Sequence, residues 1–331
     1  MNITLVSPVP VTSLSGNRTT AVRWQRLLEE LGHSTKLVQS WQEDEADVLV
    51  ALHARKSFDS IRRFHEARPG APLVVTLTGT DLYCDLDWSD EVLRAVDMAT
   101  RVVALQPAAL DRLPEAVHDK VHVILQKAVH DKVHVILQSA ESPPSPPKTS
   151  PDRFEVSVLS HLREVKDPLL AAMATRRLPA TSRIVVRHAG AELDEELGRQ
   201  AREETETNPR YQWLGPLPFE RARELLASSR LMVLSSREEG GANVVSEAIV
   251  DGVPVLSTDI AGSRGLLGDD YPGYYPVGDD EALANLLLRA ESEPEYLAEL
   301  VEHCARLRPR FTPEGEREAW RELLGGVLHT R

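Results

Sequence analysis

Residues 231–257 carry the pattern that most restricts the fold of this chain. A short apolar run at 231–234 is followed by a glycine pair and by a stretch of helical length whose apolar side chains stand at 244, 245, 248 and 249. A second apolar run occupies 253–257. Short apolar runs are typical of buried strands, and the spacing between them is typical of a helix. We therefore predict a strand, a helix over 242–250 and a second strand.

The start of this predicted helix is suited to an anion. Gly240 and Gly241 have no Cβ, so an anion can approach the unpaired backbone N–H groups of the first helical turn, at residues 242–244. Glu239 precedes the glycines, and Glu247 is expected about two turns inside the helix. We predict a phosphate or diphosphate site formed by Gly240, Gly241, Ala242, Asn243 and Val244 and flanked by two carboxylates, which usually bind hydroxyl groups or a metal.

The rest of the chain alternates in the same way. Such alternation is typical of a parallel sheet covered by helices on both faces, and 331 residues suit two domains. We predict an α/β protein with two Rossmann-like domains that face each other across a cleft. The expected strands include 2–6, 35–38, 48–52, 73–76, 102–105, 155–159, 184–187 and 211–214, and the expected helices include 18–31, 57–67, 90–98, 169–176, 194–204, 219–227, 294–307 and 313–328.

A proline-rich segment at 141–151 marks the expected domain boundary. We predict an N-terminal domain at 1–140, a linker at 141–151, a C-terminal domain at 152–308, and a final helix at 309–331 that crosses back to the first domain. The sequence AVHDKVHVILQ occurs at 116–126 and again at 128–138. Either copy can supply the last strand of the first domain, as 121–125 or 133–137, and we expect the other to bulge as a loop or helix extension. Four histidines belong to the copied unit, and we interpret them as part of the duplication rather than as a metal site.

Three loops of the first domain follow predicted strands. Ligands of open parallel sheets bind at the carboxyl ends of the strands, where these loops lie. The first also opens a helix, which makes it a second candidate anion site. The candidates are Ser15, Gly16, Asn17 and Arg18 after the first strand, His53 and Arg55 with Lys56 after the third, and Thr80 and Asp81 after the fourth.

Charge and composition exclude several classes of function. The net charge of −13 argues against nucleic acid or an anionic membrane surface as a partner, since both require basic patches. Cys84 and Cys304 are the two cysteines, far apart, which suggests reduced thiols and a cytoplasmic protein. No stretch approaches the ~18 consecutive apolar residues of a membrane span. No GxGxxG motif follows a strand, which argues against a dinucleotide-dependent dehydrogenase.

The spacing of Glu239, Gly240 and Glu247, followed by GVPV at 252–255, resembles the signature of retaining nucleotide-sugar glycosyltransferases with the GT-B fold, family 4. The resemblance implies that Glu239 contacts the donor sugar, the helix start takes the diphosphate, and Glu247 holds the ribose hydroxyls. It also implies that no essential metal or other cofactor is needed. Asp85-Leu86-Asp87 matches the metal-binding DxD of the other glycosyltransferase fold, but it lies in the wrong half of the chain.

Residues 160–168 resemble the diphosphate loop of the same family, which usually has an arginine and a lysine five positions apart. Lys166 stands at the lysine position. His161 stands at the arginine position, with Arg163 two residues further on. Lysine offers phosphate a compact positive charge, whereas histidine offers a weaker charge that depends on pH.

Read together, the loops resemble the selenosugar synthases of selenoneine biosynthesis, a branch of these glycosyltransferases. The resemblance rests on TSLSGNRTTA, ALHAR, VTLTGTDLY, SHLREVKDP, REEGGANVVSEAIVDGVPVL and GLLGDDYPGYYPVGD. It implies a UDP-hexose donor, such as UDP-N-acetylglucosamine or UDP-glucose, and selenophosphate as acceptor. Selenophosphate is nucleophilic near neutral pH, so it needs cationic anchoring more than a general base.

On this hypothesis the catalytic residues are Glu239, Arg18 and Lys166. Gly16, His161, Arg163, Lys166 and residues 239–244 and 247 would bind the donor. Ser15, Asn17, Arg18, His53, Arg55, Thr80 and Asp81 would bind the acceptor. Two alternatives stay open. One is a transferase that uses a hydroxyl acceptor, whose proton goes to Asp81, to His53 or to the donor phosphate itself, and the other is an inactive nucleotide-sugar-binding protein. The anomeric outcome, the preferred hexose and the choice between monomer and homodimer are open as well.

Overall fold

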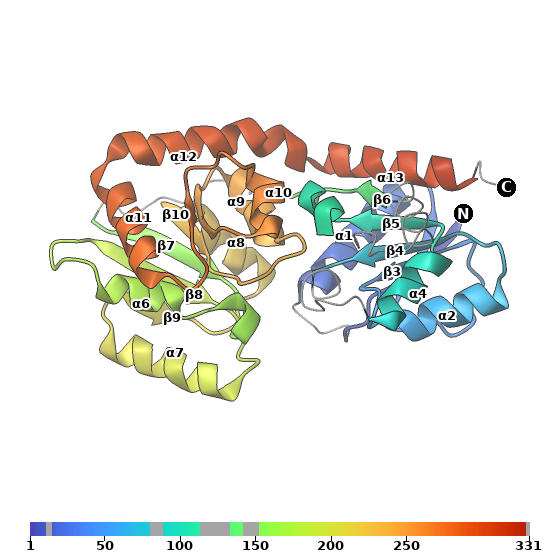
Figure 1. Ribbon diagram of the computed structural model, residues 1–331, viewed down its shortest axis with the longest axis horizontal. Helices are drawn as coiled ribbons and strands as arrows, with labels where there is room; N and C mark the ends of the chain where they lie inside the picture. Colours follow the sequence, from blue (N-terminus) through green and yellow to red (C-terminus); the bar gives the residue numbers. More distant parts are fainter. Residues whose placement is uncertain (11–14, 80–88, 113–132, 142–151, 329–331) are drawn as a thin grey trace, which may run out of the picture. The chain divides into compact units, whose positions relative to one another are not determined.

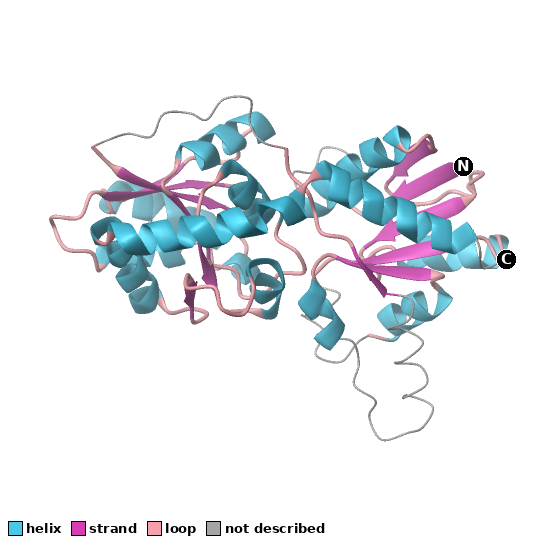
Figure 2. Cartoon of the chain, turned by 90° about the horizontal axis from the view of Figure 1, so that it is seen from above, coloured by secondary structure: helices cyan, strands magenta, loops and turns pink. Residues whose placement is uncertain are grey.

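The computed structural model describes residues 1–10, 15–79, 89–112, 133–141 and 152–328 (Figure 1). The chain forms two compact units. Unit 1 comprises Met1–Ser139, Glu239–Ala242 and Thr312–Arg331, and unit 2 comprises Ala140–Glu238 and Asn243–Phe311. In each unit the strands lie between helices (Figure 2), as the alternation of the sequence predicts.

Unit 1 contains a parallel sheet with strand order β2-β1-β3-β4-β5-β6. Strands β3 and β4 are buried along their whole length, as expected for central strands of a sheet covered on both faces. The strands are β1 Asn2–Val6, β2 Ser34–Val38, β3 Val48–Leu52, β4 Leu73–Leu77, β5 Arg101–Ala104 and β6 Val133–Val135, and the helices are α1 Gly16–Glu30, α2 Phe58–Ala67, α4 Asp90–Met98, the 3₁₀ turn η1 Pro107–Arg112 and α13 Pro313–Leu328.

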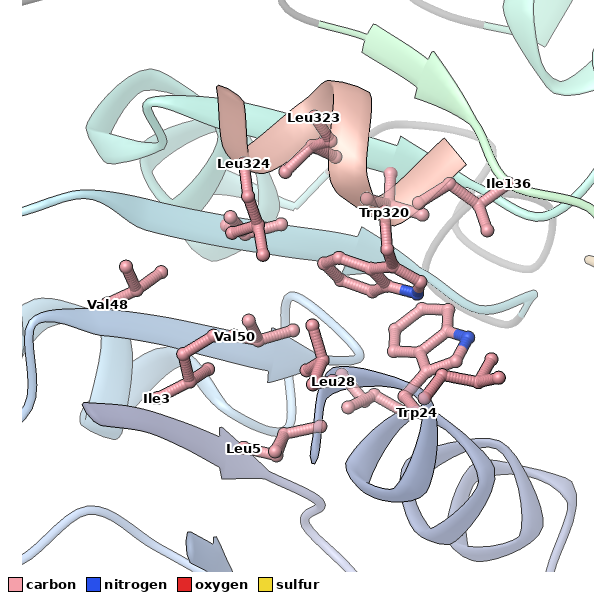
Figure 3. Packing of buried hydrophobic residues seen from close by; sticks show 14 of the residues in the cluster. Ile3, Leu5, Trp24, Leu28, Val48, Val50, Ile136, Trp320, Leu323 and Leu324 are labelled. Carbon is pink, nitrogen blue, oxygen red and sulfur yellow. The ribbon is translucent and has the colours of Figure 1, made fainter. Parts of the chain in front are cut away.

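Helix α13 completes the hydrophobic core of unit 1. Trp320 packs edge to face on Trp24 of α1, with ring centroids 4.7 Å apart (Figure 3). Both indoles are fully buried among side chains of β1 and β3. The buried carboxylate of Glu316, on the same helix, accepts hydrogen bonds from Trp24 Nε1 at 2.7 Å and from the Ser139 N–H at 2.9 Å. Helix α13 is therefore joined to unit 1 by both apolar and polar contacts.

Unit 2 contains a second parallel sheet, with strand order β12-β11-β10-β7-β8-β9. Its strands are β7 Phe154–Leu159, β8 Ile184–Ala189, β9 Tyr211–Trp213, β10 Leu231–Leu234, β11 Val255–Thr258 and β12 Tyr274–Tyr275. Its helices are α6 Leu170–Arg176, α7 Glu195–Thr207, α8 Phe219–Ser228, α9 Asn243–Asp251, α10 Ala261–Leu267, α11 Asp280–Ser292 and α12 Pro294–Leu307, with the 3₁₀ turns η2 Glu164–Lys166 and η3 Arg308–Phe311.

The predicted fold class of two parallel-sheet α/β domains is confirmed, with some differences in detail. Helix α9 begins at Asn243, one residue later than expected, so Glu247 lies one turn inside it and the expectation of two turns is wrong. The second copy of the repeat supplies strand β6. The first copy, residues 142–151 of the linker and residues Thr80, Asp81, Cys84 and 85–87 lie outside the described residues.

Candidate functional site

The sheet of unit 2 reverses its strand order between β7 and β10. Strands β8 and β9 lie on one side of this point, and β11 and β12 lie on the other. Open α/β sheets bind their ligands at the carboxyl ends of the strands on either side of such a point, where the loops that leave these strands lie. Here these are the loop with His161 and Lys166, and the loop that starts at Ser235 and leads to Glu239.

Hydrogen bonds hold these two loops together. Ser235 Oγ donates to the backbone carbonyl of Lys166 at 2.9 Å, and the N–H of Arg237 donates to the carbonyl of Val165 at 2.8 Å. Arg237 Nη2 also pairs with Asp167 Oδ2 at 2.9 Å. Asp167 adopts the left-handed conformation, with φ of 42°, directly after Lys166. The backbone of Lys166 is therefore fixed by contacts on both sides.

His161 is held in one orientation at the start of the first loop. The N–H of Ala191 donates to His161 Nδ1 at 3.0 Å, so this nitrogen carries a lone pair and the ring proton of the neutral imidazole is on Nε2. The ring can thus offer a hydrogen bond where the related family has an arginine, but without the permanent charge. Arg163 is exposed at the surface of the same loop.

A second histidine contacts the residue that precedes His161. His188 is fully buried, and its ring contacts the Tyr211 hydroxyl at 2.7 Å and the Ser160 carbonyl at 2.8 Å. The pKa of His188 is lowered to about 4, mainly by burial and to a smaller extent by the nearby His161, although the Ser160 carbonyl raises it. Next to it, a Cβ on Gly190 would lie 1.8 Å from the Ser160 carbonyl oxygen, so only glycine fits there. Close packing thereby fixes the backbone just before His161.

Glu247 lies on α9, the helix that follows the second loop. Its carboxylate is 15% exposed and lies 3.7 Å from the guanidinium of Arg223, which is on α8. Asp251, one turn further along α9, contacts the same guanidinium and is completely covered. Burial raises the pKa of Asp251 to about 7, although Arg223 lowers it.

The glycines before α9 have a packing role in addition to the predicted one. The segment Glu239–Ala242 belongs to unit 1. A Cβ on Gly240 would lie 2.5 Å from the backbone of Gly79, and one on Gly241 would lie 2.6 Å from Leu105 Cβ. The absence of a side chain is therefore required by the protein's own backbone, whether or not an anion binds. The N–H groups of Asn243 and Val244 lie in the first turn of α9.

The candidate acceptor residues of unit 1 lie at the corresponding place in the other sheet, where the strand order reverses between β1 and β3. Ser15 caps α1, and its hydroxyl accepts from the N–H of Arg18 at 3.4 Å, so Gly16, Asn17 and Arg18 form the first turn. His53 follows β3 with φ of 69°, and its side chain is buried, whereas Arg55 is exposed. The described candidates of unit 1 thus gather at one edge of one sheet.

Known proteins with similar sequences are glycosyltransferases. The model of the family described as "Glycosyl transferases group 1" matches residues 143–306. This part, just under half of the chain, is similar to that family. A curated relative, glycosyltransferase 1 domain-containing protein 1 of Xenopus tropicalis, is 24% identical over 326 residues, which cover 94% of each protein. The family evidence supports a glycosyltransferase, as the signature around Glu239 and Glu247 predicts.

Solved structures match the fold of the whole chain. Anabaena HepE in complex with UDP-glucose has a TM-score of 0.74 at 18% identity, covering 98% of this chain and 100% of HepE. A glycosyltransferase from Rickettsia africae has a TM-score of 0.75 at 14% identity, covering 100% of this chain and 99% of the other. The two parallel-sheet domains therefore match the GT-B architecture.

Several residues around the candidate site were not predicted from the sequence. Ser235 and Arg237 hold the lysine loop, and Arg223 and Asp251 surround Glu247. Ser235 and Arg237 precede Glu239 closely, but nothing in their spacing signals a contact with residues 165–167.

No three His, Cys, Asp or Glu side chains within the described ranges gather closely enough to hold a metal ion. Among the helices that the structure describes, none combines the length and the apolar character that a membrane crossing requires.

Proposed function

We propose that this glycosyltransferase transfers a hexose from a UDP-sugar, UDP-N-acetylglucosamine or UDP-glucose, to selenophosphate. The choice of a UDP-sugar as donor rests on the two joined loops of unit 2. Lys166 and the start of α9 follow adjacent strands at the point where the strand order reverses. A lysine charge and a helix N-terminus are both suited to a diphosphate. The structure of HepE with UDP-glucose supports the same class of donor.

The proposed acceptor is a small anion. The first turn of α1 and the side chains of Arg18 and Arg55 offer backbone N–H groups and positive charge at one sheet edge, in a chain whose net charge is −13. The first turn of α1 contains no acidic residue that would oppose an anion. Together with the resemblance of the loops to selenosugar synthases, this favours selenophosphate over an uncharged alcohol.

The proposed reaction begins with attack of the selenium lone pair of selenophosphate on the anomeric carbon of the hexose. The bond between that carbon and the diphosphate oxygen breaks, and UDP takes the electron pair. Lys166, His161 and the N–H groups at the start of α9 would stabilise the charge that develops on UDP. Water then cleaves the selenium–phosphorus bond, which releases phosphate and leaves a 1-selenosugar. Glu239 would bind the hexose, Glu247 the ribose, and Arg18 would hold the attacking anion.

The donor diphosphate is stabilised in this proposal by protein cations and helix N–H groups, without an essential metal or other cofactor. A chelator should therefore leave the rate unchanged. We also propose that the protein is cytoplasmic and acts as a monomer or homodimer. Its substrates in this proposal, selenophosphate and a nucleotide sugar, are small anionic metabolites.

The experiment described below also distinguishes two other functions. A transferase that uses a hydroxyl acceptor would need a base, for which His53 is a described candidate, although its side chain is 2% exposed. An inactive protein would bind the nucleotide sugar without turnover.

The test is mass spectrometry of the purified protein with each UDP-hexose and freshly made selenophosphate, with thiophosphate, phosphate and sugar alcohols as parallel acceptors. The expected result is a hexose that carries the selenium isotope pattern, together with UDP and phosphate. Transfer to a sugar alcohol but not to selenophosphate would reject the acceptor and retain the donor. Binding without any transfer would support the inactive protein.

Variants of the acceptor residues test the anchor directly. Arg18→Ala and Arg55→Ala should each raise the KM for selenophosphate and leave UDP binding unchanged, because they remove charge near the acceptor only. Arg63→Ala, which removes a partly exposed arginine on α2, is the matched control. Unchanged use of selenophosphate by both acceptor-site variants would reject this anchor.

A further inference from the structure

Arg223 is a buried arginine with an unusual set of neighbours. It lies on α8 and is only 7% exposed, and an arginine is rarely buried unless its charge is paired. Its Nη2 contacts Asp251 Oδ1 and donates to the carbonyl of Glu141 at 3.0 Å. Its Nη1 lies 3.7 Å from Glu247 Oε2. One guanidinium therefore faces two carboxylates of the neighbouring helix.

The two carboxylates differ in what they can do. Glu247 and Asp251 are four residues apart on α9 and thus lie on the same face, one turn from each other. The Asp251 side chain is fully covered, whereas that of Glu247 is 15% exposed. The shorter, covered carboxylate can serve only the protein, while the longer one can also reach a ligand. Arg223 is anchored at its Nη2 side and contacts Glu247 from its Nη1 side.

The buried polar atoms of this cluster that lack hydrogen bonds also favour a contact between Arg223 and Glu247. Within the described residues, Arg223 Nη1 and Asp251 Oδ2 are buried and make no hydrogen bond. Such atoms are costly in a buried site. A shift of Glu247 by a fraction of an ångström would bring its carboxylate within hydrogen-bond distance of Nη1. Because burial raises the pKa of Asp251 to about 7, Asp251 alone does not fully balance the charge of Arg223, and this charge remains available to Glu247.

We propose that Arg223 is a positioning residue, held by Asp251 and the Glu141 carbonyl, that orients the Glu247 carboxylate toward the ribose hydroxyls of the bound nucleotide. This inference rests on the proposed function, since it assigns Glu247 to the ribose. A glutamate on a helix surface has several rotamers, and the fixed guanidinium restricts this choice before the ligand arrives. The donor site would then be arranged in advance for a ribonucleotide.

The test compares the affinities of UDP and 2′-deoxy-UDP, measured by calorimetry, in the wild type and in variants. The wild type should bind UDP roughly tenfold or more tightly than 2′-deoxy-UDP, as expected for a hydroxyl bound to a charged acceptor. Arg223→Met should bring this ratio close to one while leaving the affinity for 2′-deoxy-UDP nearly unchanged. Arg223→Lys should restore part of the ratio, and Asp251→Asn should lower it partially.

The controls separate positioning from general damage. Arg221→Met removes an exposed arginine from the same helix, paired only with Glu224 among the described ion pairs, and should leave both affinities unchanged. If Arg223→Met does not fold, Arg223→Lys and Asp251→Asn decide the matter. A ratio equal to that of the wild type in the folded variants, or an equal loss for both nucleotides, would overturn the positioning role and leave the proposed function intact. A wild type that binds no UDP would overturn both.

Discussion

The hydroxyl of Ser235 donates a hydrogen bond to the backbone carbonyl of Lys166 across 2.9 Å, and so joins two loops that are far apart in the sequence. Lys166 follows β7, and Ser235 follows β10, its neighbour in the sheet. The lysine that we assign to the leaving UDP is therefore placed by the loop that leads to Glu239. Correct placement of this charge requires both loops.

Ser235→Ala should weaken UDP binding about fivefold. The variant loses one hydrogen bond to the Lys166 carbonyl, which is worth about 1 kcal/mol, so the loop and its lysine become less ordered. Calorimetric titration with UDP measures the effect. Ser292→Ala is the control, because the Ser292 hydroxyl donates to the Leu288 carbonyl within its own helix, at 2.7 Å. Equal affinities for UDP in wild type and Ser235→Ala would show that the loop contact is not needed for binding.

The two glutamates of the motif should differ in their effects. Glu247→Ala should weaken UDP itself by roughly ten- to a hundredfold, as expected for loss of hydrogen bonds to a charged acceptor. Glu239→Ala should leave UDP affinity unchanged and weaken the intact UDP-hexose. Titrations of each variant with UDP and with the UDP-hexose distinguish these roles. If both variants lost affinity for UDP to the same extent, the assigned roles would be wrong.

The free energy of unfolding of unit 2 should fall as the pH falls from 6.5 toward about 4, because of His188. The pKa of His188 is about 4 in the folded protein and near 6.5 in the unfolded chain, so between these values the unfolded state binds the extra proton. The stability is thus complete above 6.5, and about 3 kcal/mol of it is lost as the pH passes down through this window.

Replacing this histidine should remove that pH dependence. His188→Gln keeps a donor and an acceptor but has no titratable group, so its unfolding free energy should change less with pH than that of the wild type. Urea titrations of both proteins at several pH values provide the comparison. Parallel curves for the two proteins would show that His188 does not titrate as proposed.

Trp320→Ala should lower the stability of unit 1 by about 3–5 kcal/mol, the usual cost of removing a large buried aromatic side chain. The indole is fully buried and packs on Trp24. Val22→Ala, on α1 with 47% of the residue exposed, should change the stability by no more than about 0.5 kcal/mol. Urea unfolding followed by tryptophan fluorescence measures both. A loss in Trp320→Ala as small as that in the control would contradict the role of α13 in the core.

Most strands and helices could be predicted from local patterns, because their apolar side chains recur with the spacing of the element. Helix α4 begins and ends where the sequence predicted, at Asp90 and Met98. Strand β12 was missed because it has only two residues, and α10 because two glycines interrupt its seven residues. Short elements depend on neighbouring strands and helices more than on their own pattern.

The candidate site was predictable only in part, for a similar reason. Lys166, Glu239 and Glu247 stand in motifs whose spacing is visible in the sequence, and the predictions of their roles await the tests above. The contacts of Arg223 with Asp251 and of Arg237 with Asp167 join residues 28 and 70 positions apart. No local pattern encodes such contacts, because they arise from the order of strands in the sheet.

The packing of Trp320 on Trp24 also has a consequence for protein synthesis. Helix α1 leaves the ribosome early, but the indole of its Trp24 can contact Trp320 and Glu316 only after residues 313–328 have been synthesised. In the meantime unit 1 exposes an apolar surface that its own contiguous segment, Met1–Ser139, cannot cover. We therefore expect the nascent first unit to keep this apolar surface uncovered until residues 313–328 have been synthesised.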